Sequence, residues 1–93
     1  MKLNRMGKPP GCKLLRIEAD LEAGEGDAII QSIQIRGDFF ASPEEGLEEI
    51  EKELAGKKVK ELASAFDALV RQKGIEVYGI SGAGIAAVIE QAQ

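Results

Sequence analysis

The stretch that decides the fold is Ile35-Arg36-Gly37-Asp38-Phe39-Phe40-Ala41-Ser42-Pro43-Glu44-Glu45. It leads from an apolar strand into a charged helix and holds two of the chain's four aromatic residues. A serine followed three places later by glutamate predicts a capping box, in which each side chain binds the other's backbone N–H. Proline suits the first helical position, and we expect Gly37 to bend the strand out of the sheet. The stretch is therefore either a corner of the core or a surface for a partner.

Two segments before this stretch predict an antiparallel hairpin. Residues 13–22 and 28–36 alternate apolar and polar side chains, although Gln31 interrupts the inward set of the second segment and Ile30 falls on its outer face. Alternation with period two is typical of a strand that buries one face. Residues 24–27, Gly-Glu-Gly-Asp, supply the turn.

Apolar residues recur at helical spacing in the rest of the chain. They predict helices over 43–54, 59–73 and 82–92, the last capped by Ser81, and a short strand over 76–80 that would join the hairpin. The fold class is therefore α+β, with two layers: a small antiparallel sheet packed against about three helices. The predicted core residues are Leu15, Ile17, Ile33, Ile35, Leu47, Ile50, Leu62, Phe66 and Leu69.

Composition excludes several kinds of site. Ninety-three residues make one domain. The chain has no histidine and one cysteine, so it holds no Ser-His-Asp or Cys-His catalytic group and no zinc site of Cys and His ligands. We expect Cys12 to be a small neutral residue at a strand entrance, with a nucleophile as the alternative. The carboxylates of the first helix lack a calcium-loop pattern and indicate a solvated face.

The charge is unevenly distributed along the chain. Residues 1–16 hold five of the twelve basic residues and no acid, whereas the net charge of the whole chain is −4. We interpret residues 1–10 as a flexible basic arm and residues 11–93 as a single domain. The arm is either a solvated tail or a contact for an anionic partner. No apolar run is long enough for a membrane span and no signal peptide is visible, so we expect a cytoplasmic protein.

Two phosphate-binding functions receive little support. The Ser-Gly-Ala-Gly turn at 81–84 opens a helix, where anions can bind, but it is not a G-x-G-x-x-G motif and no P-loop lysine follows. A nucleic-acid binder would use the basic arm. The acidic remainder of the chain and its few aromatic residues argue against that function.

Four motifs together resemble the C-terminal accessory domain of lipoate–protein ligases. They are Gly11-Cys12-Lys13-Leu14-Leu15-Arg16-Ile17, where that family tends to read Gly-Gly-Lys-Leu before a strand; Ile35-Arg36-Gly37-Asp38-Phe39-Phe40 with Ser42-Pro43-Glu44-Glu45; Leu54-Ala55-Gly56; and Gly79-Ile80-Ser81. The resemblance covers residues 11 to 92. Gly-Asp-Phe-Phe with Pro-Glu-Glu is its most specific part. Cys12 departs from the usual glycine, which indicates that the backbone there need not be left-handed.

The resemblance implies an accessory role. In many bacterial ligases this domain follows a catalytic domain; here it is the whole chain, beginning at a methionine, which is similar to the split arrangement of two subunits. That arrangement implies a heterodimer with a catalytic lipoate–protein ligase subunit. The heterodimer would use ATP, Mg and lipoate to form lipoyl-AMP, and would transfer the lipoyl group to a lysine of a lipoyl-domain acceptor protein.

The motifs that handle ATP, lipoate and the acceptor lysine in that family are absent here. We therefore expect this chain alone to bind no cofactor, to carry no catalytic residue and to have no activity. The alternative is a small α+β adaptor with an unrelated protein partner. We expect neither nucleic acid nor a membrane as partner.

Candidate interface residues lie where the resemblance is densest, together with two bases near the arm. They are Lys13, Arg16, Gly37, Asp38, Phe39, Phe40 and Ser42.

Overall fold

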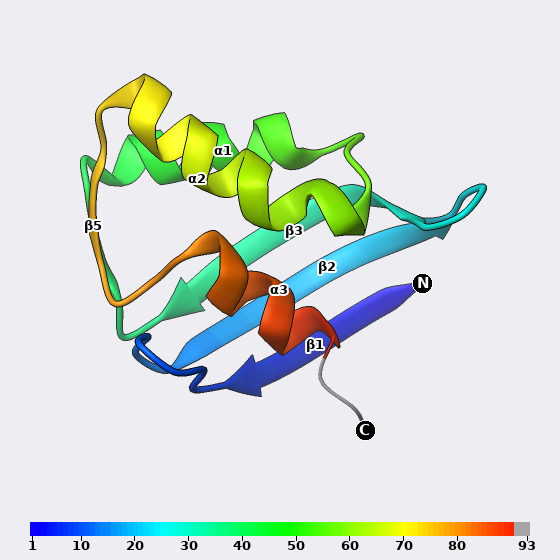
Figure 1. Ribbon diagram of the computed structural model, residues 1–93, viewed down its shortest axis with the longest axis horizontal. Helices are drawn as coiled ribbons and strands as arrows, with labels where there is room; N and C mark the ends of the chain where they lie inside the picture. Colours follow the sequence, from blue (N-terminus) through cyan, green and yellow to red (C-terminus); the bar gives the residue numbers. More distant parts are fainter. Residues whose placement is uncertain (91–93) are drawn as a thin grey trace.

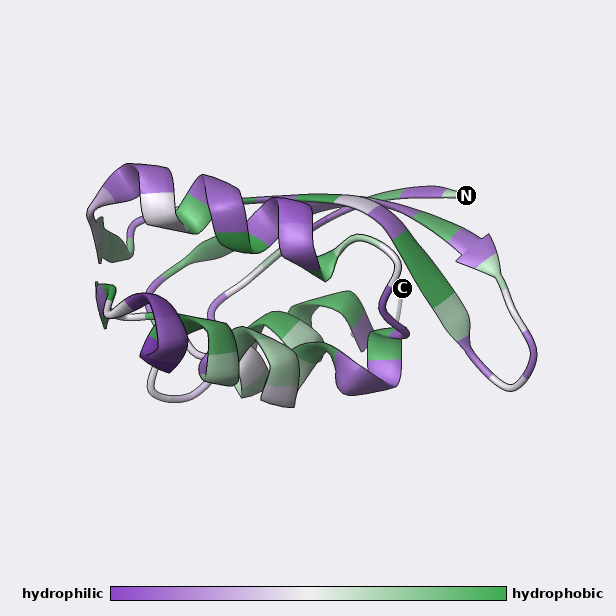
Figure 2. Ribbon diagram, turned by 90° about the horizontal axis from the view of Figure 1, so that it is seen from above, coloured by the Kyte–Doolittle hydropathy of each residue, from purple (hydrophilic) through white to green (hydrophobic). Residues whose placement is uncertain are grey.

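A three-stranded antiparallel sheet forms one layer of the computed structural model, which describes residues 1–90 (Figure 1). Helices α2 and α3 form the second layer over one face of the sheet, and α1 lies along the free edge of β3 (Figure 2). This arrangement confirms the predicted α+β fold. The elements are β1 (Lys2–Gly7), β2 (Leu15–Ala23), β3 (Ala28–Gly37), β4 (Phe40–Ser42), α1 (Glu44–Leu54), the 3-10 turn η1 (Val59–Glu61), α2 (Leu62–Lys73), β5 (Glu76–Tyr78) and α3 (Gly82–Glu90).

The hairpin of β2 and β3 forms as predicted but contains a bulge. Asp20 lies opposite Ser32 and Leu21 opposite Ile30, so Gln31 is left without a partner in the strand pairing. A bulge sets two residues of one strand against one of the other and changes the face that the following side chains take. Ile30 is therefore fully buried. The prediction that Ile30 lies on the outer face is wrong for this reason.

The prediction of a flexible arm over residues 1–10 is also wrong, because residues 2–7 form β1. This strand pairs with β2 along its whole length, with Leu3 opposite Ala19 and Arg5 opposite Ile17. Arg5 also donates a hydrogen bond from Nη1 to the carbonyl of Ile89, at 2.8 Å. The inward positions of β1 thus include an arginine, and the sequence shows no apolar alternation there. Pairing with β2 holds the strand in place.

The short strand predicted at 76–80 forms as β5, but it does not join the hairpin. It pairs with β4 in a separate two-stranded ribbon, with Phe40 opposite Tyr78 and Ser42 opposite Glu76. The ribbon stands at one end of the molecule, beside the point where β3 ends (Figure 1). The third strand of the main sheet is β1 instead.

Helix α1 begins at Glu44, and the predicted capping box is absent. Pro43 occupies the N-cap position with φ −75° and ψ 150°, and no side chain binds the first turn. The Ser42–Pro43 peptide bond is cis. Ser42 belongs to β4, where it pairs with Glu76, so it is held outside the helix. The backbone N–H of Gly46 bonds to the Pro43 carbonyl at 3.0 Å instead.

The outer edge of β3 is occupied by α1 and the chain after it. The carboxylate of Glu51 accepts the backbone N–H of Ile35 at 2.8 Å. Farther along the strand, Ile30 donates to the Lys57 carbonyl at 2.9 Å and accepts from the N–H of Gly56 at 2.7 Å. The carboxylates of α1 were all expected to be solvated. Glu51 departs from that expectation, since its side chain is only 12% exposed.

The core matches the predicted core except at Leu47, which is only partly buried. The other eight predicted residues are buried, and Phe66 is the largest fully buried side chain among the described residues. Ser81 caps α3 as predicted, because its hydroxyl accepts the N–H of Gly84 at 3.0 Å. Ala92, which was assigned to this helix, lies outside the described residues.

Asp27 should make the stability of the protein depend on pH. Its carboxylate accepts the backbone N–H of Lys60 at 2.7 Å, and this bond holds the pKa of Asp27 below its ordinary value of 3.8. A lowered folded-state pKa gives stability that is present above about pH 4 and lost as the pH falls through the folded value. Asp27→Asn should therefore lower the melting temperature at neutral pH and differ less from wild type in acid. An equal difference at both pH values would contradict this assignment.

Candidate partner-binding surface

Four of the five exposed large apolar side chains of the described chain belong to segments that meet at one end of the molecule. Met6 is 52% exposed, Leu14 37%, Phe40 57% and Tyr78 67%. They come from the end of β1, the connection before β2, the start of β4 and the end of β5. These segments converge at the left-hand end of Figure 1. Exposed apolar groups that gather in this way mark interaction sites. We call this surface, with Lys13, the ribbon end.

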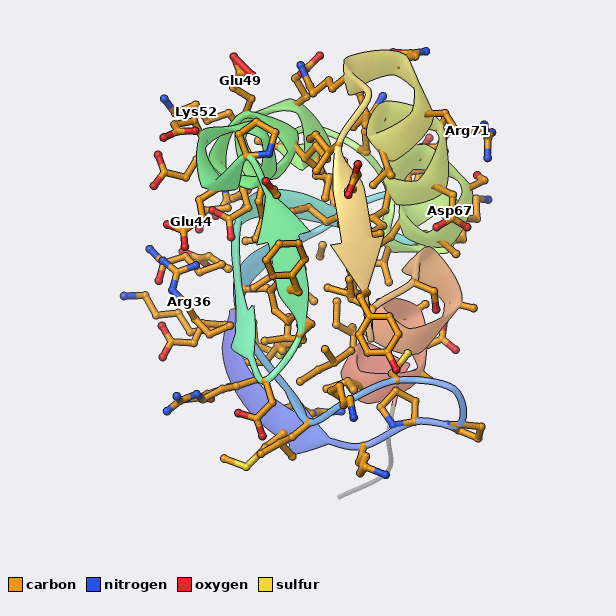
Figure 3. All side chains as sticks on the ribbon, turned by 90° about the vertical axis from the view of Figure 1, so that its left-hand side faces the viewer. Arg36, Glu44, Glu49, Lys52, Asp67 and Arg71 are labelled. Carbon is orange, nitrogen blue, oxygen red and sulfur yellow. The ribbon has the colours of Figure 1, made fainter. Side chains whose placement is uncertain are left out.

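The ribbon places two aromatic residues directly opposite each other. Phe40 and Tyr78 are direct partners in its register, and directly opposite side chains have Cβ atoms about 4.5–5.5 Å apart. Val77 points the other way and packs against the core, while Ala41 is partly buried. The ribbon is therefore attached through one face and presents the aromatic pair on the other. Figure 3 views β4 and β5 from the end of the molecule where they stand.

Lys13 connects the ribbon to the main sheet. Its Nζ lies 5.8 Å from the centroid of the Tyr78 ring, within cation–π range. Its backbone N–H donates to the carbonyl of Gly79 at 2.8 Å, and the next carbonyl, that of Leu14, accepts the N–H of Asp38 at 3.0 Å. The connection between β1 and β2 is thus hydrogen-bonded to the ends of both β3 and β5. These bonds fix the position of the aromatic pair.

Gly37 allows two chain segments to approach closely at this point. Its φ is +146°, and a Cβ there would run into the backbone carbonyl of Leu14. The strand does leave the sheet here, since β3 ends at Gly37 and the next strand is β4 of the ribbon. The predicted bend is present, and the glycine is needed for close packing as well.

Arg16 and Arg36 face each other on the open side of the sheet. Arg36 forms an ion pair with Glu51 at 3.2 Å, whereas Arg16 has no ion-pair partner within residues 1–90. Like charges directly opposite in a sheet repel each other. Because Arg36 is neutralised internally, Arg16 is the arginine of this pair that remains available to an external carboxylate.

The structure separates the seven predicted interface residues. Lys13 and Phe40 are exposed at the ribbon end, Gly37 and Asp38 make backbone contacts beneath it, and Phe39 is partly buried against the core; Arg16 lies on the open face of the sheet, and Ser42 is exposed in β4.

Tyr78, Leu14 and Met6 belong to the ribbon end but were not identified from the sequence. A signal existed for Tyr78. In the segment Glu-Val-Tyr it shares one strand face with Glu76, while Val77 takes the other, so period two places the tyrosine with the charged residue. The other two residues gave no signal, since single apolar residues in connections are common on surfaces.

Other candidate sites are occupied or buried. The Sγ of Cys12 is buried and lies 3.6 Å from the Ser81 hydroxyl. The backbone φ of Cys12 is not positive. This agrees with the indication, from the replacement of the family's glycine by Cys12, that the backbone here need not be left-handed. The N–H of Gly82, at the start of α3, already donates to the carboxylate of Asp67 at 2.9 Å. A phosphate at this helix start would have to displace that carboxylate.

Three further findings concern metal ions, membranes and cavities. No group of three or more metal-ligating side chains occurs in residues 1–90, and no helix of that range is long and apolar enough to cross a membrane. A groove of about 910 Å³ lies between the open face of the sheet and α1. Most of its lining residues are polar, among them Asn4, Glu18, Gln34 and Glu48, but about half of the lining surface is apolar.

Comparison with known proteins gives one solved structure. No family model and no curated protein matches the chain. The fold matches a chain in the structure of an archaeal lipoylation system from Thermoplasma acidophilum, described as a bi-partite lipoate protein ligase and its E2 lipoyl domain. The TM-score is 0.75 at 23% identity, over 99% of this chain and 98% of the other. At this identity the likeness shows the fold, and the two chains are nearly equal in length.

Proposed function

We propose that this chain is the accessory subunit of a two-part lipoate–protein ligase. The observation that carries the proposal is the match over nearly the full length of both chains to a component of a lipoylation system. The Gly-Asp-Phe-Phe and Pro-Glu-Glu motif, residues 37–40 and 43–45, supports the same family independently of the fold comparison. The catalytic partner would bind ATP, Mg and lipoate, and this chain would be needed for activation of lipoate to lipoyl-AMP.

The proposed role is conformational. The chain contains no histidine, and its one cysteine is buried, so we expect it to contribute to the reaction through contact with its partner. A rigid domain docked through the ribbon end would order mobile loops of the catalytic subunit around the nucleotide, which lowers the entropic cost of reaching the transition state. The accessory subunit would thereby shift its partner's conformational population.

A split assay tests this role. Adding the chain to purified catalytic subunit with ATP, Mg and lipoate should switch on lipoate-dependent pyrophosphate release. Transfer from synthetic lipoyl-AMP to a lipoyl domain should proceed without it. Equal dependence of both half-reactions would indicate a general stabiliser, and full adenylation without the chain would contradict the accessory role.

The same assay separates the accessory role from that of the acceptor. A lipoyl domain is itself modified on a lysine, so its mass increases in the reaction. The mass of this chain should stay unchanged after turnover while that of an added lipoyl domain rises. Lipoylation of this chain would reassign it to the acceptor side of the system.

A further inference from the structure

We propose that the ribbon end docks into an apolar pocket of the catalytic subunit that is bordered on one side by carboxylates. Phe40 and Tyr78 are the anchors that fill the pocket, and Lys13 and Arg16 meet the carboxylates. This inference rests on the proposed function and deepens it, since it states the chemistry of the partner's surface and the orientation of the complex.

The aromatic pair has no role in the core. Its rings point away from the body of the protein, while Val77 provides the inward contact of the ribbon. Aromatic rings bury about 150–250 Å² each when they enter a pocket. Tyrosine is also enriched among residues that dominate binding energy. Two such rings, held by backbone hydrogen bonds of Lys13 and Leu14, are already placed before binding, which reduces the ordering cost of association.

The charged side chains near the ribbon are basic at the Lys13 end and acidic at the α1 end. Lys13 lies over Tyr78, and Arg16 borders the ribbon end on the open face of the sheet, opposite Met6 in the strand pairing. Neither makes an ion pair within the described residues. At the other end of the ribbon, Ser42 and Glu76 form the last pair, next to the first turn of α1 with its two glutamates. In Figure 3, Glu44 and Arg36 lie on the same flank of the ribbon, with Glu44 nearer to its α1 end.

This arrangement of charges favours one orientation of the partner on the ribbon end. A partner with carboxylates around its pocket would be attracted at the Lys13 and Arg16 side and repelled at the α1 side. Complementary charges of this kind fix the relative orientation of two proteins and speed their encounter. The whole chain is acidic, with a net charge of −4, whereas Lys13 and Arg16 give this side of the ribbon end a local positive charge that attracts carboxylates.

The test measures binding to purified catalytic subunit by calorimetry at two salt concentrations. Phe40→Thr and Tyr78→Thr keep a residue with high strand propensity but remove the ring. Each should raise Kd about tenfold or more, since anchor residues carry most of the binding energy. The double variant Lys13→Glu with Arg16→Glu should raise Kd similarly at low salt and reverse its salt dependence, because added salt screens the repulsion that the new carboxylates cause.

Arg71→Glu is the matched control. Arg71 is exposed in the last turn of α2, so the variant makes the charge reversal that each substitution of the double variant makes, but away from the ribbon end, as Figure 3 shows. It should bind like wild type. Circular dichroism and melting temperature establish that each variant is folded. Lys13→Met, which keeps the aliphatic stem, should still lower the salt dependence if the charge acts on the partner.

The outcomes distinguish the two proposals. If the wild-type chain does not bind the catalytic subunit, the proposed function fails. If the wild-type chain binds, but the folded ring and charge variants bind as tightly as Arg71→Glu, the accessory role stands and the docking surface proposed here is overturned.

Discussion

Phe66→Ala should destabilise the protein by about 3–5 kcal/mol, the usual cost of removing a buried phenylalanine side chain. Phe66 is fully buried in α2 and is the largest such side chain in residues 1–90. Its loss removes buried apolar contacts and leaves a cavity at the junction of the two layers. A domain of this size buries little more than ~60% of its unfolded surface, so this loss would consume much of its stability.

Urea unfolding followed by circular dichroism measures the effect. Val70→Ala is the control, because Val70 lies on the same helix but is only partly buried. It should cost clearly less than Phe66→Ala, with the same dependence of the free energy of unfolding on urea concentration. A loss below about 1 kcal/mol for Phe66→Ala would show that this position is not central to the core.

Gly37→Ala should cost about 3 kcal/mol, at the upper end of what overpacking causes, and should also weaken partner binding. A Cβ at Gly37 meets the backbone carbonyl of Leu14, which cannot move without breaking its bond to the N–H of Asp38. The φ of +146° adds conformational strain for any other residue. The clash therefore affects the contact that joins the ribbon to the sheet.

Gly26→Ala distinguishes the cost of backbone strain from the cost of a steric clash. Gly26 has φ +80°, but no atom lies within 4 Å of the place that an alanine Cβ would take, so alanine there should cost only the ~1–2 kcal/mol of a left-handed backbone. Urea unfolding of both variants and calorimetry with the catalytic subunit provide the comparison. Equal losses of stability, or unchanged partner affinity for Gly37→Ala, would show that the approach to Leu14 is relaxed elsewhere.

The spacing of apolar residues correctly predicted those parts of the fold in which the pattern of a single helix or hairpin determines which side chains are buried. The hairpin, the stripe of α2 and the position of Phe66 all follow from repeating apolar residues. Three features depended on contacts between distant segments. Gln31 lies in a bulge only because of the register of β3 against β2. Arg5 lies in β1 and bonds to the carbonyl of Ile89 in α3. Ser42 pairs with Glu76 of β5 and therefore does not cap α1.

The candidate surface likewise contains residues that the sequence indicated and residues whose position depends on contacts between distant segments. Phe40 was a candidate because the motif around it is distinctive, and Lys13 because it is a base near the arm. Tyr78 was assigned to the hairpin sheet, since a strand of three residues does not specify its own neighbour. Its exposure was readable from alternation with Glu76, but its position beside Phe40 required the three-dimensional structure.

The occupied edge of β3 has a consequence for the behaviour of the protein at high concentration. An exposed strand edge is a template on which a second chain can add a strand and begin to aggregate. Here the Ile35 N–H is taken by Glu51, and both backbone groups of Ile30 are taken by Gly56 and Lys57. Edge-to-edge stacking of copies along β3 would first have to remove these contacts, so the helix that carries Glu51 also protects this edge of the sheet against aggregation.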